Sequence, residues 1–68
     1  MKPLDALGAQ LNEEVLVRLK NGWEIRGQLK AFDIHVNLVL ADAEYKDGDI
    51  DRKFKMVFIR GDMVIFVS

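Results

Sequence analysis

The feature that most constrains the fold of this chain is a change of hydrophobic pattern within residues 23–44. In the first half, apolar and polar residues alternate strictly, which is typical of a β-strand with one buried face. The apolar face of that strand consists of Trp23, Ile25, Gly27, Leu29 and Ala31. The second half, residues 37–43, is apolar almost throughout and predicts a strand that is buried on both sides. We therefore expect two neighbouring strands joined by a short turn at residues 32–36.

The flanking segments predict one helix and three further strands. Residues 3–11 should form a short helix, because Pro3 suits the first helical position and three leucines fall on one side. Asn21-Gly22 predicts a tight type I′ hairpin turn before the alternating strand. Gly27, in the middle of that strand, indicates a sharp bend of the kind found in small barrels. The three further strands are expected at residues 15–20, 52–60 and 63–67.

These elements predict a single, mostly β domain over residues 1–68, with a helix at about 3–11 and a barrel at about 15–68. A domain of 68 residues is only marginally stable without a disulfide, a metal or a partner. The chain has no cysteine and one histidine, so neither disulfides nor a structural zinc site is expected. Association with other chains is therefore the expected stabiliser.

The last two predicted strands carry more apolar side chains than a small monomeric barrel would show. One face of the fourth strand has Phe54, Met56 and Phe58, and residues 63–67 are apolar on both faces. Exposed apolar strand edges promote association with other chains. We therefore expect these two strands to pair with a neighbouring copy.

The overall charge limits how this protein can bind nucleic acid. Ten Lys and Arg residues stand against eleven Asp and Glu residues, whereas a diffuse RNA-binding surface is normally strongly basic. Any nucleic-acid site must therefore be local. The N-terminal residues lack the long apolar core of a signal peptide, and no apolar run approaches the length of a membrane span. We expect a cytoplasmic protein with no membrane association.

Two turns carry the residues most suited to function. The first contains Asp33, His35 and Asn37, and the second contains Arg60, Gly61 and Asp62. An imidazole and a guanidinium are flat groups that can sandwich a base. An asparagine amide offers one donor and one acceptor group to a pyrimidine edge, and two carboxylates could orient the amide and the guanidinium. Each residue also has a simpler explanation as a turn former, an exposed ion pair or an ordinary surface histidine.

Catalysis and metal binding have little support in the sequence. The chain has no threonine or cysteine, and its only serine is Ser68, so the usual nucleophiles are missing. His35 beside Asp33 could act as a base, but nothing identifies a substrate. The spaced aspartates of residues 46–51 are similar to a calcium loop, yet the closing glutamate and the flanking helices are missing. We expect no enzyme activity, no cofactor and no metal.

Two segments resemble the signatures of a known family. Residues 27–43, which read Gly-Gln-Leu-Lys-Ala-Phe-Asp-Ile-His-Val-Asn-Leu-Val-Leu-Ala-Asp-Ala, closely resemble the first signature of the Sm and Sm-like (LSm) proteins. Residues 59–64, Ile-Arg-Gly-Asp-Met-Val, resemble the second. With the leading helix, the resemblance covers nearly the whole chain, and the short intervening loop is most similar to archaeal members. Val36 departs from the family, which usually has methionine before the asparagine.

The resemblance implies a fold and a function. The fold would be a short helix on a strongly bent, five-stranded antiparallel SH3-like barrel. Copies would form a ring, usually of seven, in which strand five of one subunit pairs with strand four of the next. The ring would bind uridine-rich single-stranded RNA around its central pore and take part in RNA processing, with other RNA-processing proteins as further partners. By motif match, the site residues would be His35 and Arg60 for stacking, Asn37 for the base edge, and Asp33, Gly61 and Asp62 in support.

A second function remains open on the same barrel. The chain could be a protein-interaction or assembly module in which these polar residues only shape turns. The two functions differ in whether Arg60→Ala abolishes RNA binding while leaving the ring intact. The ring size and the natural RNA are not determined by these residues.

Overall fold

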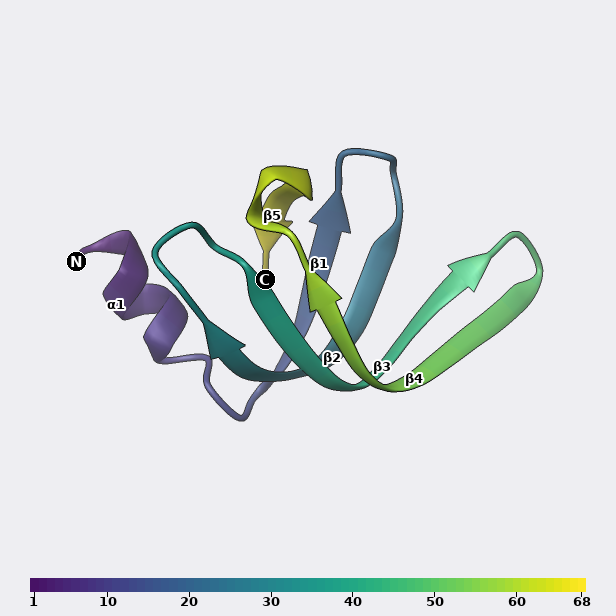
Figure 1. Cartoon of the computed structure of the whole chain (residues 1–68), viewed down its shortest axis with the longest axis horizontal. Coiled ribbons are helices and arrows are strands. Elements are labelled where there is room, and N and C mark those ends of the chain that lie inside the picture. The colour runs from purple at the N-terminus through teal and green to yellow at the C-terminus, as the bar shows by residue number, and fades with distance from the viewer.

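The computed structural model describes every residue from 1 to 68 and contains one short helix, five strands and one 3-10 turn. In chain order these are α1 (Pro3–Gly8), β1 (Glu14–Leu19), β2 (Glu24–Phe32), β3 (Leu38–Asp47), β4 (Ile50–Ile59), η1 (Gly61–Met63) and β5 (Val64–Val67). The strands form one antiparallel sheet in the order β4-β3-β2-β1-β5. Figure 1 shows that this sheet is strongly curved, with α1 beside one end. The predicted mostly β fold with a short N-terminal helix is confirmed.

The core lies inside the curve of the sheet. It consists of nine buried aliphatic residues, namely Val15, Val17, Leu19, Ile25, Leu29, Leu38, Leu40, Ala43 and Ile59. On β1 the buried residues alternate with half-buried ones, as the period-two pattern predicted. Every buried residue is apolar, so the core contains no polar side chain that would need a hydrogen-bond partner.

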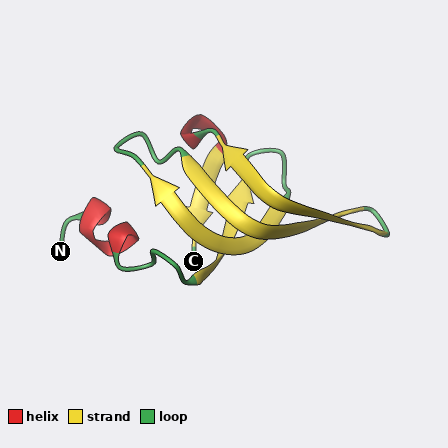
Figure 2. Cartoon of the chain, turned by 60° about the horizontal axis from the view of Figure 1, so that its bottom comes forward, coloured by secondary structure: helices red, strands yellow, loops and turns green.

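The curvature arises near the middle of the paired strands β2 and β3. The pairing of the two strands shifts register beside Gly27, and Asp42 on β3 takes a positive φ of 50°. A Cβ on Gly27 would lie 3.1 Å from the carbonyl oxygen of Ala41, which is tighter than an ordinary contact, so glycine favours the close approach of β3. Figure 2 shows the resulting bend in the long strands. The predicted role of Gly27 as a bend is confirmed.

The inward face of β2 differs from the prediction at both ends. A second register shift lies between Leu29 and Ala31, so Phe32 turns toward the core and Ala31 is exposed. An irregularity that inserts one residue moves every later side chain to the opposite face. Trp23 lies before β2 begins and is 41% exposed, so it is not a core residue.

The hairpin of β3 and β4 is longer than predicted and projects beyond the core (Figure 1). Its turn contains only Gly48 and Asp49, because the strands continue to Asp47 and Ile50 where a loop was expected. The second face of β3 is only half covered, so this strand is not buried on both sides as predicted.

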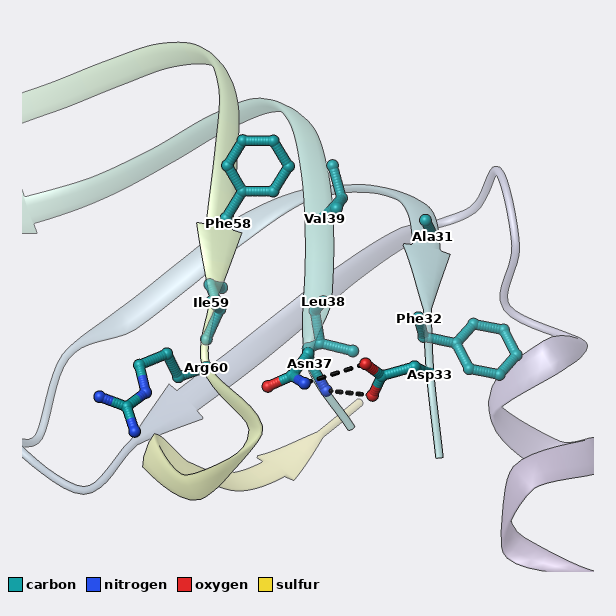
Figure 3. A pocket seen from close by; sticks show the side chains of 9 residues that line it. All are labelled: Ala31, Phe32, Asp33, Asn37, Leu38, Val39, Phe58, Ile59 and Arg60. Carbon is teal, nitrogen blue, oxygen red and sulfur yellow. Dashed lines mark hydrogen bonds between the residues drawn. The ribbon is translucent and has the colours of Figure 1, made fainter. Parts of the chain in front are cut away.

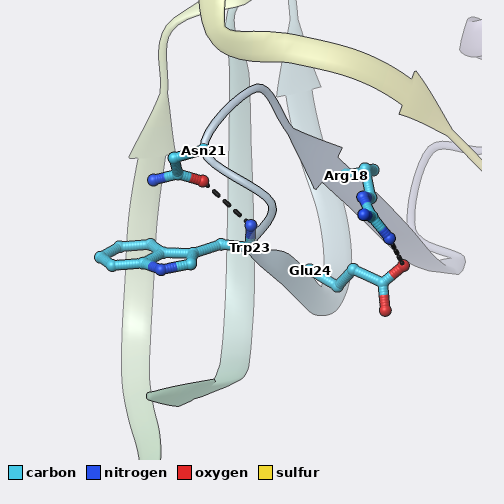
Figure 4. A network of polar contacts seen from close by, with 4 residues as sticks. All are labelled: Arg18, Asn21, Trp23 and Glu24. Atoms are coloured by element: carbon cyan, nitrogen blue, oxygen red, sulfur yellow. Dashed lines mark hydrogen bonds and ion pairs between the residues drawn. The ribbon is translucent and has the colours of Figure 1, made fainter. Parts of the chain in front are cut away.

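The buried core does not extend along the hairpin, where aromatic rings stack on one another instead. The ring of Tyr45 lies 4.8 Å from that of Trp23 and 6.0 Å from that of Phe54, with nearly parallel planes. Figure 4 shows Trp23 beside the turn between β1 and β2, where its backbone N–H donates to the side-chain Oδ1 of Asn21. Cross-strand aromatic pairs of this kind stabilise a sheet.

The helix is shorter than the predicted range of 3–11. It ends at Gly8, and the next residues continue in turns rather than as a helix. Asn12 takes a left-handed conformation with φ of 67°, and its N–H donates to the carbonyl of Leu29 on β2. This docking contact redirects the chain before a third helical turn can form. With six helical residues, the chain has no helix of the length and apolar character needed to span a membrane.

The two edges of the sheet are β4 and β5, which do not pair with each other. Both edges expose large apolar side chains, namely Phe54, Met56, Phe58, Ile65 and Phe66, which are 44–75% accessible. By contrast, Val57 and Ile59 on the opposite face of β4 turn toward the core. The predicted apolar excess on the last two strands is therefore exposed at two free edges.

Candidate nucleic-acid interface

The turn between β2 and β3 is organised by the carboxylate of Asp33. Its Oδ1 accepts hydrogen bonds from the backbone N–H groups of His35 at 2.8 Å and Asn37 at 3.1 Å. Its Oδ2 accepts the side-chain Nδ2 of Asn37 at 2.9 Å (Figure 3). Aspartate is favoured in turns because its side chain can accept such nearby backbone donors.

These donors also change the acidity of Asp33. The amide of Asn37 is the main cause that lowers the pKa of this carboxyl group below its ordinary value. The backbone N–H groups of His35 and Asn37 add to the effect, while partial loss of water opposes it. Hydrogen bonds to the charged form favour that form, so the carboxylate that holds the turn is ionised throughout the neutral range.

Asn37 joins this turn to the turn that contains Arg60. The backbone N–H of Gly61 donates to Oδ1 of Asn37 at 2.7 Å, across 24 positions of sequence. A Cβ on Gly61 would overlap the carbonyl oxygen of His35, so the two backbones can approach only because this residue is glycine. The amide of Asn37 is thus held at both ends, which leaves one N–H and one oxygen lone pair free.

In the second turn, Arg60 forms an ion pair with Asp62 of the same turn. Nη2 of Arg60 lies 2.8 Å from a carboxylate oxygen of Asp62, and both side chains are largely exposed. An exposed ion pair of this kind contributes little to stability. Its effect is to restrict where the guanidinium lies. His35 is also exposed, so both flat side chains are accessible to solvent.

A groove of about 570 Å³ lies beside the two turns. Its polar end is formed by Asp33, Asn37 and Arg60, and its apolar wall includes Ala31, Val39 and Phe58 (Figure 3). The wall residues are direct partners across β2, β3 and β4, so they form one cross-strand row. Sequence reasoning did not assign Ala31 or Val39 to the site, because this row depends on the register of the three strands.

The structure thus brings the six predicted site residues into two adjacent turns. Contacts join Asp33 to His35 and Asn37, Asn37 to Gly61, and Arg60 to Asp62. Nowhere do three or more His, Asp or Glu side chains gather closely enough to hold a metal ion. The arrangement can present one amide edge and two flat cationic or aromatic groups to a planar ligand.

Comparisons with known proteins point to one family. A model of the LSM domain matches residues 5–68. An Sm-like protein of Archaeoglobus fulgidus is 54% identical, with 98% of this chain and 88% of the relative covered. A Pyrococcus abyssi Sm protein, solved in complex with a uridine heptamer, is 46% identical with a TM-score of 0.91 over 100% of this chain and 97% of that one.

A second solved structure, the Pyrobaculum aerophilum SmAP1 heptamer, is 38% identical with a TM-score of 0.92. The match covers 100% of this chain and 92% of that chain. The domain match, the identity over nearly full lengths and the shared fold agree with the two signatures at residues 27–43 and 59–64. This chain belongs to the Sm-like (LSm) family.

Proposed function

We propose that this protein is a non-catalytic RNA-binding protein that assembles into a ring of identical subunits and acts in RNA processing. Each subunit binds uridine-rich single-stranded RNA at a pocket beside the central pore. The observation that carries this proposal is the amide of Asn37, which is fixed between Asp33 and the N–H of Gly61. The exposed side chains of His35 and Arg60 come from the same two turns.

The fixed amide supports recognition of a uracil edge. Asn37 keeps one N–H donor and one lone pair after its two internal contacts, and uracil presents one acceptor beside one N–H donor. In the proposed complex the base stacks between His35 and Arg60, and Asp62 holds the guanidinium in place. Stacking contributes about 1–3 kcal/mol per base.

Two features support assembly into a ring. Both sheet edges, β4 and β5, have unpaired backbone groups and exposed apolar side chains. We propose that β5 of one subunit pairs with β4 of the next, in a heptamer like that of the P. aerophilum relative. A ring also explains how a protein of net charge −1 binds RNA, because one Arg60 per subunit repeats around the pore. Several weak sites on one strand then gain affinity through avidity.

The composition supports a function without catalysis, because the chain lacks cysteine and threonine and its only serine is Ser68. An assembly module remains the second candidate, because the contacts of Asp33 and Asp62 also suffice to stabilise two turns. On that reading the exposed apolar edges would carry the function, and RNA binding would be nonspecific.

Native mass spectrometry with short oligo-U and oligo-C separates the two candidates. We expect a closed ring that takes up oligo-U in preference and loses it in Arg60→Ala without dissociating. Arg52→Ala is the matched control, because Arg52 is also an exposed arginine near a carboxylate, Asp47, but lies on the projecting hairpin. A ring that binds both RNAs equally, or that is unaffected by Arg60→Ala, would favour the assembly module.

A further inference from the structure

The turn that carries His35 and Asn37 contains a valine in an unusual conformation. Val36 has a positive φ of 61°, in the left-handed region. A β-branched residue rarely adopts this region, because its Cβ substituents crowd the adjacent backbone. The two other non-glycine residues with positive φ are Asn12 and Asp42, which are types that tolerate it better.

The hydrogen bonds of the turn explain why this conformation is required. The N–H of Val36 donates to the carbonyl of Asp33 at 3.0 Å, and the N–H of Asp33 donates to the carbonyl of Asn37 at 3.3 Å. A tight turn closed in this way needs a left-handed residue before the next strand begins. Hairpins normally place glycine or asparagine at such a position.

Contacts on both sides hold Val36 in place. Its half-buried side chain packs against the core of the sheet. On the other side, a Cβ added to Gly61 would lie within 3 Å of the carbonyl carbon of Val36, so the second turn rests against this backbone. The segment between the two proposed RNA-binding side chains is therefore clamped between the core and the neighbouring turn.

We propose that Val36 is a positioning residue for the RNA site. A glycine would adopt the left-handed conformation more readily, but it would give the turn no side chain to anchor in the core. With valine, packing offsets the backbone strain and keeps His35 and Asn37 in one orientation before RNA arrives. This inference rests on the proposed function, since it concerns how strongly and how selectively that site binds a uracil base.

Three substitutions of Val36 separate anchoring from backbone strain. Val36→Gly and Val36→Asn relieve the strain and remove the anchor, whereas Val36→Met keeps an apolar anchor and removes the β-branch. We expect Val36→Gly to weaken binding of uridine monophosphate by about three- to tenfold, because only part of the population keeps the binding conformation. Val36→Asn should weaken it less, since asparagine favours the left-handed region, and Val36→Met should bind like the wild type.

The readout is the ratio of affinities for uridine and cytidine monophosphate, measured by titration. A mononucleotide avoids avidity along an RNA strand. In Val36→Gly the ratio should fall while the assembly and the midpoint of thermal unfolding change little. The matched control is Val57→Ala, since Val57 is also half-buried against the core but lies on β4 and not in either of the two turns. That variant should unfold more easily and keep the ratio.

The inference is overturned if Val36→Gly keeps the wild-type ratio, or if Val57→Ala lowers the ratio as much. It is also overturned if Val36→Met loses selectivity as fully as Val36→Gly. A wild-type protein with no preference for uridine would instead overturn the proposed function. In that event, NMR relaxation of the His35 and Asn37 amides still tests the positioning role. Those amides should be rigid in the wild type and in Val36→Met, and mobile in Val36→Gly.

Discussion

Two turns at opposite ends of β3 each begin with an aspartate but have different surroundings. The turn at Asp33–Asn37 lies against the η1 turn and shares a hydrogen bond with it. The hairpin tip at Asp47–Ile50 projects from the sheet, and a Cβ on its Gly48 would meet no atom within 4 Å. A turn that begins with aspartate is therefore in contact with a neighbouring segment in one place and forms an exposed tip in the other. What distinguishes them is the segment packed alongside.

The largest effect should be the difference in stability between variants of Gly61, which contacts the first turn, and of Gly48 in the hairpin tip. Gly61→Ala places a methyl group where the carbonyl oxygen of His35 lies, so we expect a loss of about 3 kcal/mol in unfolding free energy and no uridine binding. Gly48→Ala only forces alanine into a left-handed conformation, with φ of 64°, at a cost of about 1 kcal/mol. Denaturant unfolding of both variants measures the difference. Equal losses would show that the contact between the two turns is not important for stability.

The next largest effect should be a difference in uridine affinity between variants of Asp33 in the first turn and Asp49 in the hairpin tip. Asp33→Ala removes the acceptor for three N–H donors, so the orientation of Asn37 is no longer fixed and uridine affinity should fall about tenfold. Asp49→Ala, at the hairpin tip, should leave the affinity unchanged. Titration with uridine monophosphate measures both. If the two variants bind alike, the carboxylate of Asp33 does not position the site.

A smaller effect should appear with pH. The pKa of Asp33 is lowered in the folded protein, chiefly by the amide of Asn37, relative to about 3.9 in an unfolded chain. Its contribution to stability is therefore complete above the unfolded value and is lost as pH falls through the folded value. The wild type should keep this contribution at pH 5, and it should begin to lose it below about pH 4.

Asp33→Asn lacks the titrating group, so the difference in stability between this variant and the wild type should shrink only below that pH. Thermal unfolding from pH 3 to pH 7 measures the difference. A difference that already shrinks between pH 5 and pH 7 would contradict the lowered pKa.

The smallest effect should come from the ion pair of the hairpin tip. Arg52 and Asp47 approach to 3.6 Å, but both side chains are about half exposed. Surface pairs of this kind contribute less than about 1 kcal/mol, so Arg52→Ala should change unfolding free energy by that amount or less. Denaturant unfolding at low and high salt provides the check. A larger, salt-sensitive loss would mean that the tip is more ordered than its exposure indicates.

Local sequence patterns predicted much of the fold. Alternation along β1 and the bend at Gly27 agree with the structure, because each depends on residues that interact over a few positions. The predicted end of the helix was wrong, because the N–H of Asn12 donates to the carbonyl of Leu29, which lies far along the chain. Ala31 was placed on the wrong face for a related reason, since the register shift beside it arises from pairing with β3.

The sequence by itself determined the two polar turns, their residue types and the apolar excess on the last strands. Composition, periodicity and signature motifs are properties of the chain that need no partner segment. Only the tertiary structure decided that Asn37 contacts Gly61, that Val36 is anchored in a left-handed conformation, and that Ala31, Val39 and Phe58 form one wall. These contacts join segments more than 20 positions apart or depend on strand register. Register is fixed only when the whole core packs at once.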